Sequence, residues 1–232
     1  AFKGGIYIPL LLLLFMIPKR NFGEKVKYPV VVASAILLAV VTFAAVNSNI
    51  FKDVSSSTSG SENELMWTES EGFTLRRMFT HPKEALCMLF NTFFLMGGTH
   101  YAEMFASGFG WLQIYTSGFL TAGFTVLMVL TLLNCEGREI CFNKKQRIIS
   151  LSAAAVSIFI IVISMWIFWT PAGSAHIVGL QGRYFIPLLF CAVYPLKNSR
   201  CIIKKDIGGG ISFTAVMFHA LTFWEIYIRM AV

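Results

Sequence analysis

The sequence predicts an all-α, polytopic membrane protein with about six spanning helices and one further interfacial or re-entrant segment. The first indication is composition, because 56% of the 232 residues are hydrophobic and only 13% are charged. A soluble domain carries roughly twice that charged fraction. The second indication is that apolar residues form long stretches, and the third is that Lys and Arg gather in short runs between those stretches. Such runs are typical of loops that set the orientation of a membrane protein.

Five apolar stretches have the length, or nearly the length, of a helix that crosses a bilayer, which takes about 20 residues. They are residues 5–18, 30–46, 113–134, 148–169 and 210–230. Pro29 stands at the first turn of the second stretch, where proline is well tolerated. Trp166 and Trp169 close the fourth stretch, as interfacial aromatic residues do.

Two further stretches are less clear. Residues 184–196 would make about 20 Å of helix and are bounded by Arg183 and Pro195. We predict that they form a sixth span, at a place where the bilayer is thinned or the helix is partly enclosed by protein. Residues 85–106 are long enough to cross, but their polar and glycine content suits backbone that lines a cavity. These polar and glycine residues are Asn91, Thr92, Gly97, Gly98, His100 and Glu103.

Loop charge predicts the orientation of the chain. Three basic runs each contain four Lys or Arg, and the positive-inside rule places all three in the cytoplasm. They are residues 19–27, 138–147 and 197–205. The loops at residues 47–71 and 171–183 are then external. This alternation works only if residues 85–106 do not cross the membrane, so we predict that they form the interfacial or re-entrant segment.

The chain divides into three parts along its length. Residues 1–46 hold two transmembrane helices joined by a cytoplasmic basic loop, and residues 47–112 hold an external loop with a Ser-rich linker and the interfacial segment. Residues 113–232 hold the remaining transmembrane helices and the external loop at 171–183. The chain begins at Ala1, close to an apolar stretch, and we expect it to be the C-terminal part of a longer protein.

The sequence identifies no cofactor and no metal site. The five cysteines lack the spacing and the neighbouring histidines of a zinc site, so we expect free thiols. A cluster of four glutamates after the linker is a solvated loop or, alternatively, a place for a divalent cation, although its spacing matches no calcium loop. These are Glu62, Glu64, Glu69 and Glu71. The net charge of +7 comes without a zinc-finger or RNA-binding motif, and we predict no nucleic-acid partner.

The candidate binding residues lie on the predicted external side. Arg183 stands at the mouth of the short span, directly after Gln181 and a glycine. A guanidinium there binds a phosphate or pyrophosphate, anchors the helix at lipid headgroups, or forms an ion pair within the protein. We take Arg183 as the main lipid-phosphate-binding candidate, with Gln181 and Tyr184 beside it. Arg76 and Arg77 are a second candidate contact or, alternatively, the plain amphipathic start of a helix.

Three further residues are candidates for proton transfer. His176 and His81 are candidate proton carriers, although a lone histidine more often makes a structural hydrogen bond. Glu103 is a candidate general base or cation ligand, or else a structural partner for a neighbouring group. No Ser-His-Asp order, phosphate-binding loop or carboxylate pair stands out, and the sequence leaves the catalytic residue unknown.

Several sequence runs together resemble one family. His81-Pro82 opens the polar-spotted apolar segment, and we predict a helix that starts there with proline at its first position. FASGFGWL at residues 105–112 is similar to that family's Gly-Gly-Trp-Leu turn. WTP at residues 169–171 precedes IVGLQGRYFIPL at residues 177–188. This pattern resembles the bacterial membrane proteins called domain of unknown function 2142 (DUF2142), whose signature is Gly-x-Gln-Gly-Arg-Tyr-Phe-x-Pro. The resemblance covers roughly residues 75–196 and, more loosely, the whole chain.

The resemblance implies a fold similar to that of the GT-C glycosyltransferases, with this chain as the C-terminal half. Those enzymes use a polyprenyl-phosphate sugar on the external face of the membrane, and their catalytic acidic residue usually lies in the first external loop, outside this chain. We therefore predict the C-terminal membrane portion of a glycosyltransferase for cell-surface polysaccharide, in a multi-pass protein of the bacterial cytoplasmic membrane. Its partners would be membrane lipid and the polyprenyl-phosphate-linked sugar. A lipid-linked sugar flippase or transporter and a non-catalytic membrane scaffold subunit are the alternatives.

Overall fold

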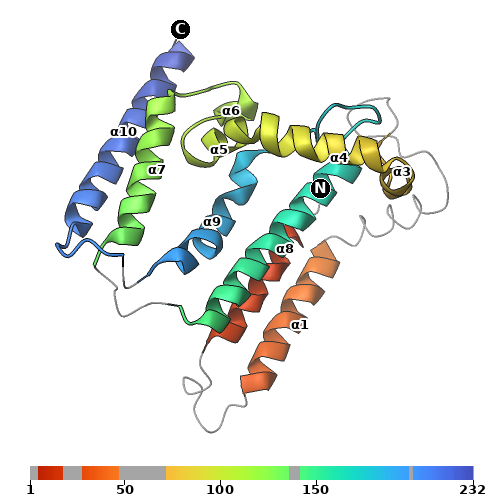
Figure 1. Ribbon diagram of the computed structural model, residues 1–232, viewed down its shortest axis with the longest axis horizontal. Helices are drawn as coiled ribbons and strands as arrows, with labels where there is room; N and C mark the ends of the chain where they lie inside the picture. Colours follow the sequence, from red (N-terminus) through yellow and green to blue (C-terminus); the bar gives the residue numbers. More distant parts are fainter. Residues whose placement is uncertain (1–4, 18–27, 47–71, 136–141, 199–200, 232) are drawn as a thin grey trace. The chain divides into compact units, whose positions relative to one another are not determined.

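The computed structural model describes residues 5–17, 28–46, 72–135, 142–198 and 201–231, which form helices and connecting turns without a strand (Figure 1). The all-α prediction is confirmed for these residues. Two units divide the chain: Ala1–Leu95 with Ile148–Leu180 form unit 1, and Met96–Arg147 with Gln181–Val232 form unit 2. The predicted Ser-rich linker, the glutamate cluster, the first basic run and part of the second and third runs lie outside the described residues.

Three of the described helices are long and apolar enough to cross a membrane. They are α1 (Tyr28–Val46), α8 (Lys144–Trp169) and α10 (Gly208–Ala231). Each of them coincides with a predicted span, and the chain is a membrane protein on this ground. α8 begins with basic residues and ends at Trp166 and Trp169, so a charged boundary marks one end of the helix and an aromatic boundary marks the other.

Several shorter apolar helices are partly or wholly 3₁₀, so they extend further per residue than an α-helix. η1 (Gly5–Met16) is a 3₁₀ helix of 12 residues, which extends about 24 Å because a 3₁₀ helix rises about 2.0 Å per residue. The predicted short span consists of η4 (Gly182–Phe185), α9 (Ile186–Val193) and η5 (Tyr194–Leu196), of which the first and last are also 3₁₀. Together they extend about 26 Å, which comes close to the ~30 Å hydrocarbon core of a bilayer.

The prediction that a helix spans residues 113–134 is wrong at its start, because α7 begins only at Gly118 (Gly118–Leu133). A tight turn around the four-residue α6 (Phe109–Leu112) precedes it, and the Phe109 N–H donates to the Ile114 carbonyl at 3.0 Å. Three residues in this turn have positive φ, and a helix cannot continue through left-handed backbone. They are Gly108 (73°), Gly110 (57°) and Leu112 (66°).

Residues 85–106 do not form one continuous helix. α4 (Pro82–Phe90) begins with proline at its first position, as predicted, and runs into the π-helical turn η3 (Asn91–Leu95). α5 (Gly97–Phe105) follows after Met96. In Figure 1, α4 runs in a different direction from α8, the long helix of the same unit.

An aromatic contact and a short backbone bridge hold the C-terminal end of α8 in unit 1. Phe73 and Trp166 are almost fully buried, and their ring centroids lie 5.3 Å apart. The Phe73 N–H donates to the Thr170 carbonyl at 2.9 Å, next to a bridge between Gly72 and Pro171. These contacts join the segment before α3 (Leu75–Thr80) to the loop that follows α8.

Two buried threonines hold the backbone of that loop. Thr170 Oγ1 accepts the Val178 N–H at 3.1 Å, and Thr92 Oγ1 accepts the Ile177 N–H at 2.9 Å. Both threonines are 0% exposed, and each hydroxyl also donates to a carbonyl of its own helix or helix end. Since buried N–H groups that lack an acceptor are costly, these side chains fix where residues 171–180 lie within unit 1.

In unit 2, α7 and α10 lie antiparallel and side by side (Figure 1). At the end where α7 stops, the Ile203 N–H donates to the Leu133 carbonyl at 2.7 Å. Arg147 Nη2 donates to the Lys197 carbonyl at 2.9 Å. The described parts of the second and third basic runs therefore both belong to unit 2 and are hydrogen-bonded to neighbouring elements there.

The start of α10 carries its own capping carboxylate. Asp206 Oδ1 accepts the Gly208 N–H at 2.9 Å and the Asn134 side-chain N–H at 3.2 Å. The hydrogen bond from the Gly208 backbone is the larger cause, and the one from the Asn134 side chain the smaller, of a pKa of Asp206 below its usual value. A lowered pKa means that Asp206 stabilises this end above its unfolded-state pKa, and the contribution is lost as the pH falls through the folded-state pKa.

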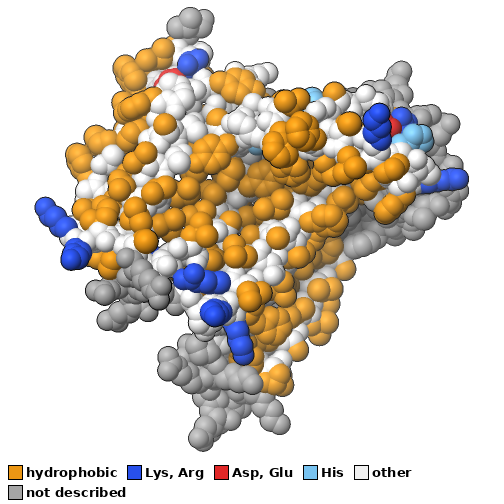
Figure 2. Space-filling view, in the orientation of Figure 1, with side chains coloured by type: hydrophobic (Ala, Val, Ile, Leu, Met, Phe, Trp, Pro, Cys, Tyr) orange, Lys and Arg blue, Asp and Glu red, His pale blue; other side chains and the backbone are white. Residues whose placement is uncertain are grey.

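Hydrophobic side chains cover the helices, and Lys and Arg gather near helix ends (Figure 2). Leu38 on α1 is 69% exposed and Phe223 on α10 is 70% exposed. A soluble protein rarely exposes so large a contiguous apolar surface. In hydrocarbon that exposure costs nothing, so the surface fits the membrane location that helix length indicates.

Replacing Thr170 with valine should destabilise the protein. The substitution keeps the shape of the side chain and removes the acceptor of the Val178 N–H, so we expect the free energy of unfolding to fall by about 1–3 kcal/mol. Thermal unfolding in detergent or nanodiscs measures this. Thr131→Val is the matched control, because Thr131 is exposed and its hydroxyl bonds only the Leu127 carbonyl of its own helix. Equal stability of the Thr170→Val protein and wild type would contradict the role of Thr170.

Candidate functional site

The candidate site is the segment that leads into α9 in unit 2. Gln181 precedes η4, Gly182 begins it, and Pro187 stands in the first turn of α9. Arg183 is exposed, and among the described residues it makes no hydrogen bond and no ion pair. The next residue, Tyr184, is half-buried. The guanidinium of Arg183 is therefore free to bind a group from outside the described chain.

Gly182 lies directly against the backbone of α5. A Cβ atom at this position would lie 1.8 Å from the His100 carbonyl oxygen and 2.7 Å from Glu103 Cβ. Neither a backbone atom nor the root of a side chain can move aside cheaply. Only glycine fits here, so the glycine before Arg183 allows the loop to touch the helix.

Glu103 is the polar centre of this contact. Its side chain is only 4% exposed, and its Oε2 accepts the Gly182 N–H at 2.6 Å. His100 Nδ1 lies 3.4 Å from the same oxygen. A Cβ atom at Gly108, which has a φ of 73°, would lie 2.8 Å from Glu103 Cγ. Two glycines thus enclose one buried carboxylate.

Two polar atoms in this region are buried and have no hydrogen-bond partner among the described residues. They are His100 Nε2 and Gln181 Oε1. Gln181 was predicted to assist phosphate binding, and a buried acceptor oxygen cannot do so. Since the two ends of an amide side chain differ only in O and N, its NH₂ group is the end that would donate to an anion.

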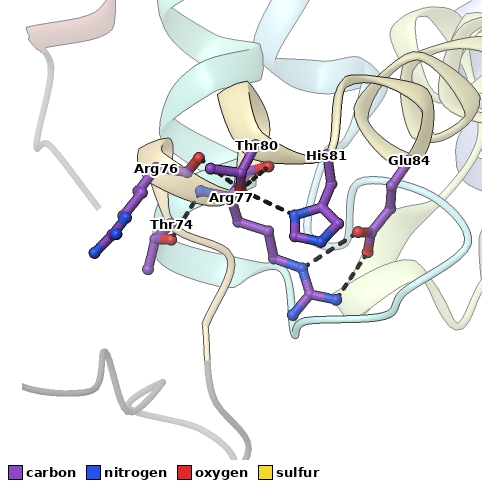
Figure 3. A network of polar contacts seen from close by, with 6 residues as sticks. All are labelled: Thr74, Arg76, Arg77, Thr80, His81 and Glu84. Carbon is purple, nitrogen blue, oxygen red and sulfur yellow. Dashed lines mark hydrogen bonds and ion pairs between the residues drawn. The ribbon is translucent and has the colours of Figure 1, made fainter.

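Arg77 in unit 1 is already paired. Its Nε and Nη2 donate to the two carboxylate oxygens of Glu84 at 3.3 and 3.2 Å (Figure 3). Its guanidinium carbon lies 5.7 Å from the centre of the Phe73 ring. This two-point pair neutralises most of its charge locally. The exposed Arg76 points away from Glu84 (Figure 3). Of the two arginines predicted to contact phosphate, only Arg76 has a guanidinium that is not engaged by Glu84.

The two predicted proton-transfer histidines, His81 and His176, both lie in unit 1. His81 Nδ1 is 2.9 Å from Thr80 Oγ1 (Figure 3). His176 is half-buried between two anchored residues, since Asn91 Nδ2 donates to the Ala175 carbonyl at 2.8 Å and the Ile177 N–H is bound by a threonine. His176 is thus held at a defined place on the loop.

The structure divides the predicted site residues between the two units. Within unit 2 it brings Glu103 against the segment that bears Arg183. The sequence analysis did not predict the roles of Thr92, Thr170 and Gly108. A polar residue in an otherwise apolar stretch is the signal that could have identified Thr92. Unit 2 contains Gln181, Arg183, Tyr184 and Glu103, and unit 1 contains Arg76, Arg77, His81 and His176.

Unit 2 also contains an apolar groove of about 450 Å³ between α7 and α10. Phe119, Val126 and Phe218 are among its lining residues, and no charged side chain lines it. Such a lining suits a hydrocarbon chain. In the described part of the protein, no group of three or more His, Cys, Asp or Glu is placed to hold a metal ion, and the four described cysteines are free thiols.

Comparison with protein families gives one match. Residues 1–192 match the family described as predicted membrane protein (DUF2142). The chain belongs to this family. The matched region includes the GLQGRYFIPL run at residues 179–188, so the predicted DUF2142 resemblance is confirmed, and it extends further toward the N-terminus than residues 75–196. Comparison with curated proteins and with solved structures gives no match.

In this DUF2142 chain, replacing Gly182 with alanine should be strongly destabilising. The added Cβ has no room against the His100 carbonyl, and overpacking of this kind costs about 3 kcal/mol or prevents folding. Gly209→Ala is the control, because a Cβ there meets nothing within 4 Å and alanine favours the helix by up to about 1 kcal/mol. Thermal unfolding of the two variants should give opposite shifts. A Gly182→Ala protein as stable as Gly209→Ala would refute the close contact.

Proposed function

We propose that this DUF2142 chain is the C-terminal membrane portion of a glycosyltransferase that takes a polyprenyl-phosphate-linked sugar as donor and builds cell-surface polysaccharide. The observation that carries the proposal is the unpaired, exposed Arg183 on a backbone that is fixed on both sides. A flexible arginine could snorkel to any headgroup, whereas a guanidinium on fixed backbone is suited to one bound phosphate.

Backbone hydrogen bonds support this reading of Arg183. The Gly182 N–H is bound by Glu103 at 2.6 Å, and the Tyr184 N–H donates to the Gln181 carbonyl at 3.1 Å. The amides on both sides of Arg183 are therefore occupied. The side chain carries five N–H donors in a rigid fork, which match the oxygen atoms of a phosphate.

Arg183 would act on the phosphate that leaves the sugar. As the bond between sugar and phosphate breaks, negative charge grows on the lipid phosphate, and a preorganised donor beside it lowers the barrier. One such donor is commonly worth about 3 kcal/mol of transition-state stabilisation. Gln181 and Tyr184 are the neighbouring groups that would assist. The resemblance to GT-C enzymes assigns the acidic residue that activates the acceptor to an upstream external loop.

The rest of the donor would be held by apolar surface. The groove between α7 and α10 in unit 2 has no charged lining, and an isoprenoid chain is the part of the donor that suits it. Van der Waals contact and not charge would bind this part. The donor then combines one anionic group and one long hydrocarbon chain, and unit 2 contains a feature suited to each.

Arg183→Ala should abolish sugar transfer from a labelled polyprenyl-phosphate sugar to acceptor in membranes that contain the full-length protein. Arg183→Lys should also lose at least about tenfold, because an ammonium cannot form the two-point contact. Arg229→Ala is the control, since Arg229 lies on α10 of the same unit and pairs with Glu225 at 2.9 Å. Full activity in both Arg183 variants would refute the phosphate role. Movement of the labelled lipid between leaflets without transfer would instead identify a flippase.

The proposed orientation in a bacterial cytoplasmic membrane makes a separate prediction. Single-cysteine variants would carry either Ala175→Cys in the loop after α8 or the native Cys201, both of which are exposed positions. We expect a membrane-impermeant maleimide to label residue 175 in intact cells and Cys201 only after permeabilisation. Labelling of both positions in intact cells would contradict the orientation.

A further inference from the structure

A carboxylate that is almost fully buried requires a physical reason. Glu103 lies on α5, its side chain is 4% exposed, and its closest polar partner lies 79 residues away along the chain. Removing a carboxylate from water is unfavourable unless hydrogen bonds replace the lost hydration. The group that donates a hydrogen bond to the buried carboxylate should therefore indicate what Glu103 does.

That partner is a backbone amide. Glu103 Oε2 accepts the Gly182 N–H at 2.6 Å, which is a short, charge-assisted hydrogen bond, whereas His100 Nδ1 lies farther away at 3.4 Å. A bond to a side chain can follow that side chain as it moves. A bond to a backbone amide instead fixes the position of the chain, and here the fixed residue is the one immediately before Arg183.

Sterics reinforce the hydrogen bond. The Cα of Gly182 is so close to α5 that a Cβ would lie 1.8 Å from the His100 carbonyl oxygen, and a Cβ at Gly108 would likewise meet the Glu103 side chain, at 2.8 Å from its Cγ. Neither the carboxylate nor the glycine can shift without breaking these contacts. The backbone on the other side of Arg183 is held by the Tyr184 N–H, which donates to the Gln181 carbonyl at 3.1 Å.

We infer that Glu103 is a positioning residue for Arg183: by holding the Gly182 amide, it fixes the backbone from which the guanidinium reaches the phosphate of a polyprenyl-phosphate lipid. This inference rests on the proposed function of Arg183. It replaces the proton-transfer role predicted for Glu103. A general base must reach the proton that it removes, and Oε2 faces the Gly182 amide in a place almost closed to solvent.

The hydrogen bond itself is tested by hydrogen exchange of the full-length protein in lipid nanodiscs, followed by mass spectrometry of the peptide that contains Gly182. We expect the Gly182 amide to exchange at least about tenfold faster in Glu103→Ala. Glu103→Gln should be intermediate, because an amide oxygen accepts the bond without the charge. Glu225→Gln is the matched control, since it removes a carboxylate of the same unit that bonds Ser117 and Arg229. An unchanged Gly182 rate in Glu103→Ala would overturn the inference whatever the ligand.

The effect on Arg183 is tested by binding of polyprenyl phosphate and of the same polyprenol without phosphate. The affinity for polyprenyl phosphate divided by the affinity for polyprenol isolates phosphate recognition, because a loss of fold weakens the binding of both lipids alike. We expect Arg183→Ala to lower this ratio about tenfold or more and Glu103→Ala to lower it about threefold to tenfold. The double variant should match Arg183→Ala alone, because the two residues act on the same contact.

The possible results separate the two proposals. An unchanged ratio in Arg183→Ala would overturn the proposed function and the phosphate role of both residues, even if the exchange experiment shows that Glu103 holds Gly182. A ratio lowered by Arg183→Ala but not by Glu103→Ala would overturn only the positioning role. If Glu103→Ala weakened the binding of both lipids equally, the role of Glu103 would be merely structural, which contradicts the inference. A double variant with a lower ratio than Arg183→Ala would show that Glu103 acts independently, which also contradicts the inference.

Discussion

The hydrogen bond from the Gly182 amide to the buried Glu103 carboxylate determines where the Gln-Gly-Arg segment lies in unit 2. A loop that approaches apolar surroundings must satisfy its own backbone N–H groups, and water is scarce there. Side chains supply the acceptors in this protein. Glu103 does so in unit 2, and Thr92 and Thr170 do so for the adjoining loop residues in unit 1. This constraint explains why polar residues interrupt the apolar segment at residues 85–106.

The candidate site joins this held backbone to a free guanidinium. Arg183 makes no hydrogen bond or ion pair among the described residues, so its side chain is available to an anion. Arg77 shows the opposite case, since Glu84 and the Phe73 ring already engage it. Charge alone therefore does not mark a binding residue. Arg183 combines an unpaired charge with hydrogen-bonded backbone amides on both sides, and the same unit contains the apolar groove.

Hydrophobic stretches were sufficient to predict α1, α8 and α10, because a span needs only length and low charge. His81-Pro82 likewise predicted the start of α4, since proline fixes φ locally. The start of α7 was missed because positive φ at Leu112 is not a property that its sequence reveals. Sequence also could not separate a catalytic Glu103 from a structural one. Its partner is 79 residues away, and periodicity describes only neighbours along the chain.

The most direct test of this account is a cryo-electron microscopy structure of the full-length protein in lipid nanodiscs with polyprenyl phosphate bound. We expect phosphate density within hydrogen-bonding distance of the Arg183 guanidinium, with the Glu103 carboxylate still accepting the Gly182 N–H. Phosphate bound at another place, or a Gly182 amide turned away from Glu103 while phosphate contacts Arg183, would contradict it.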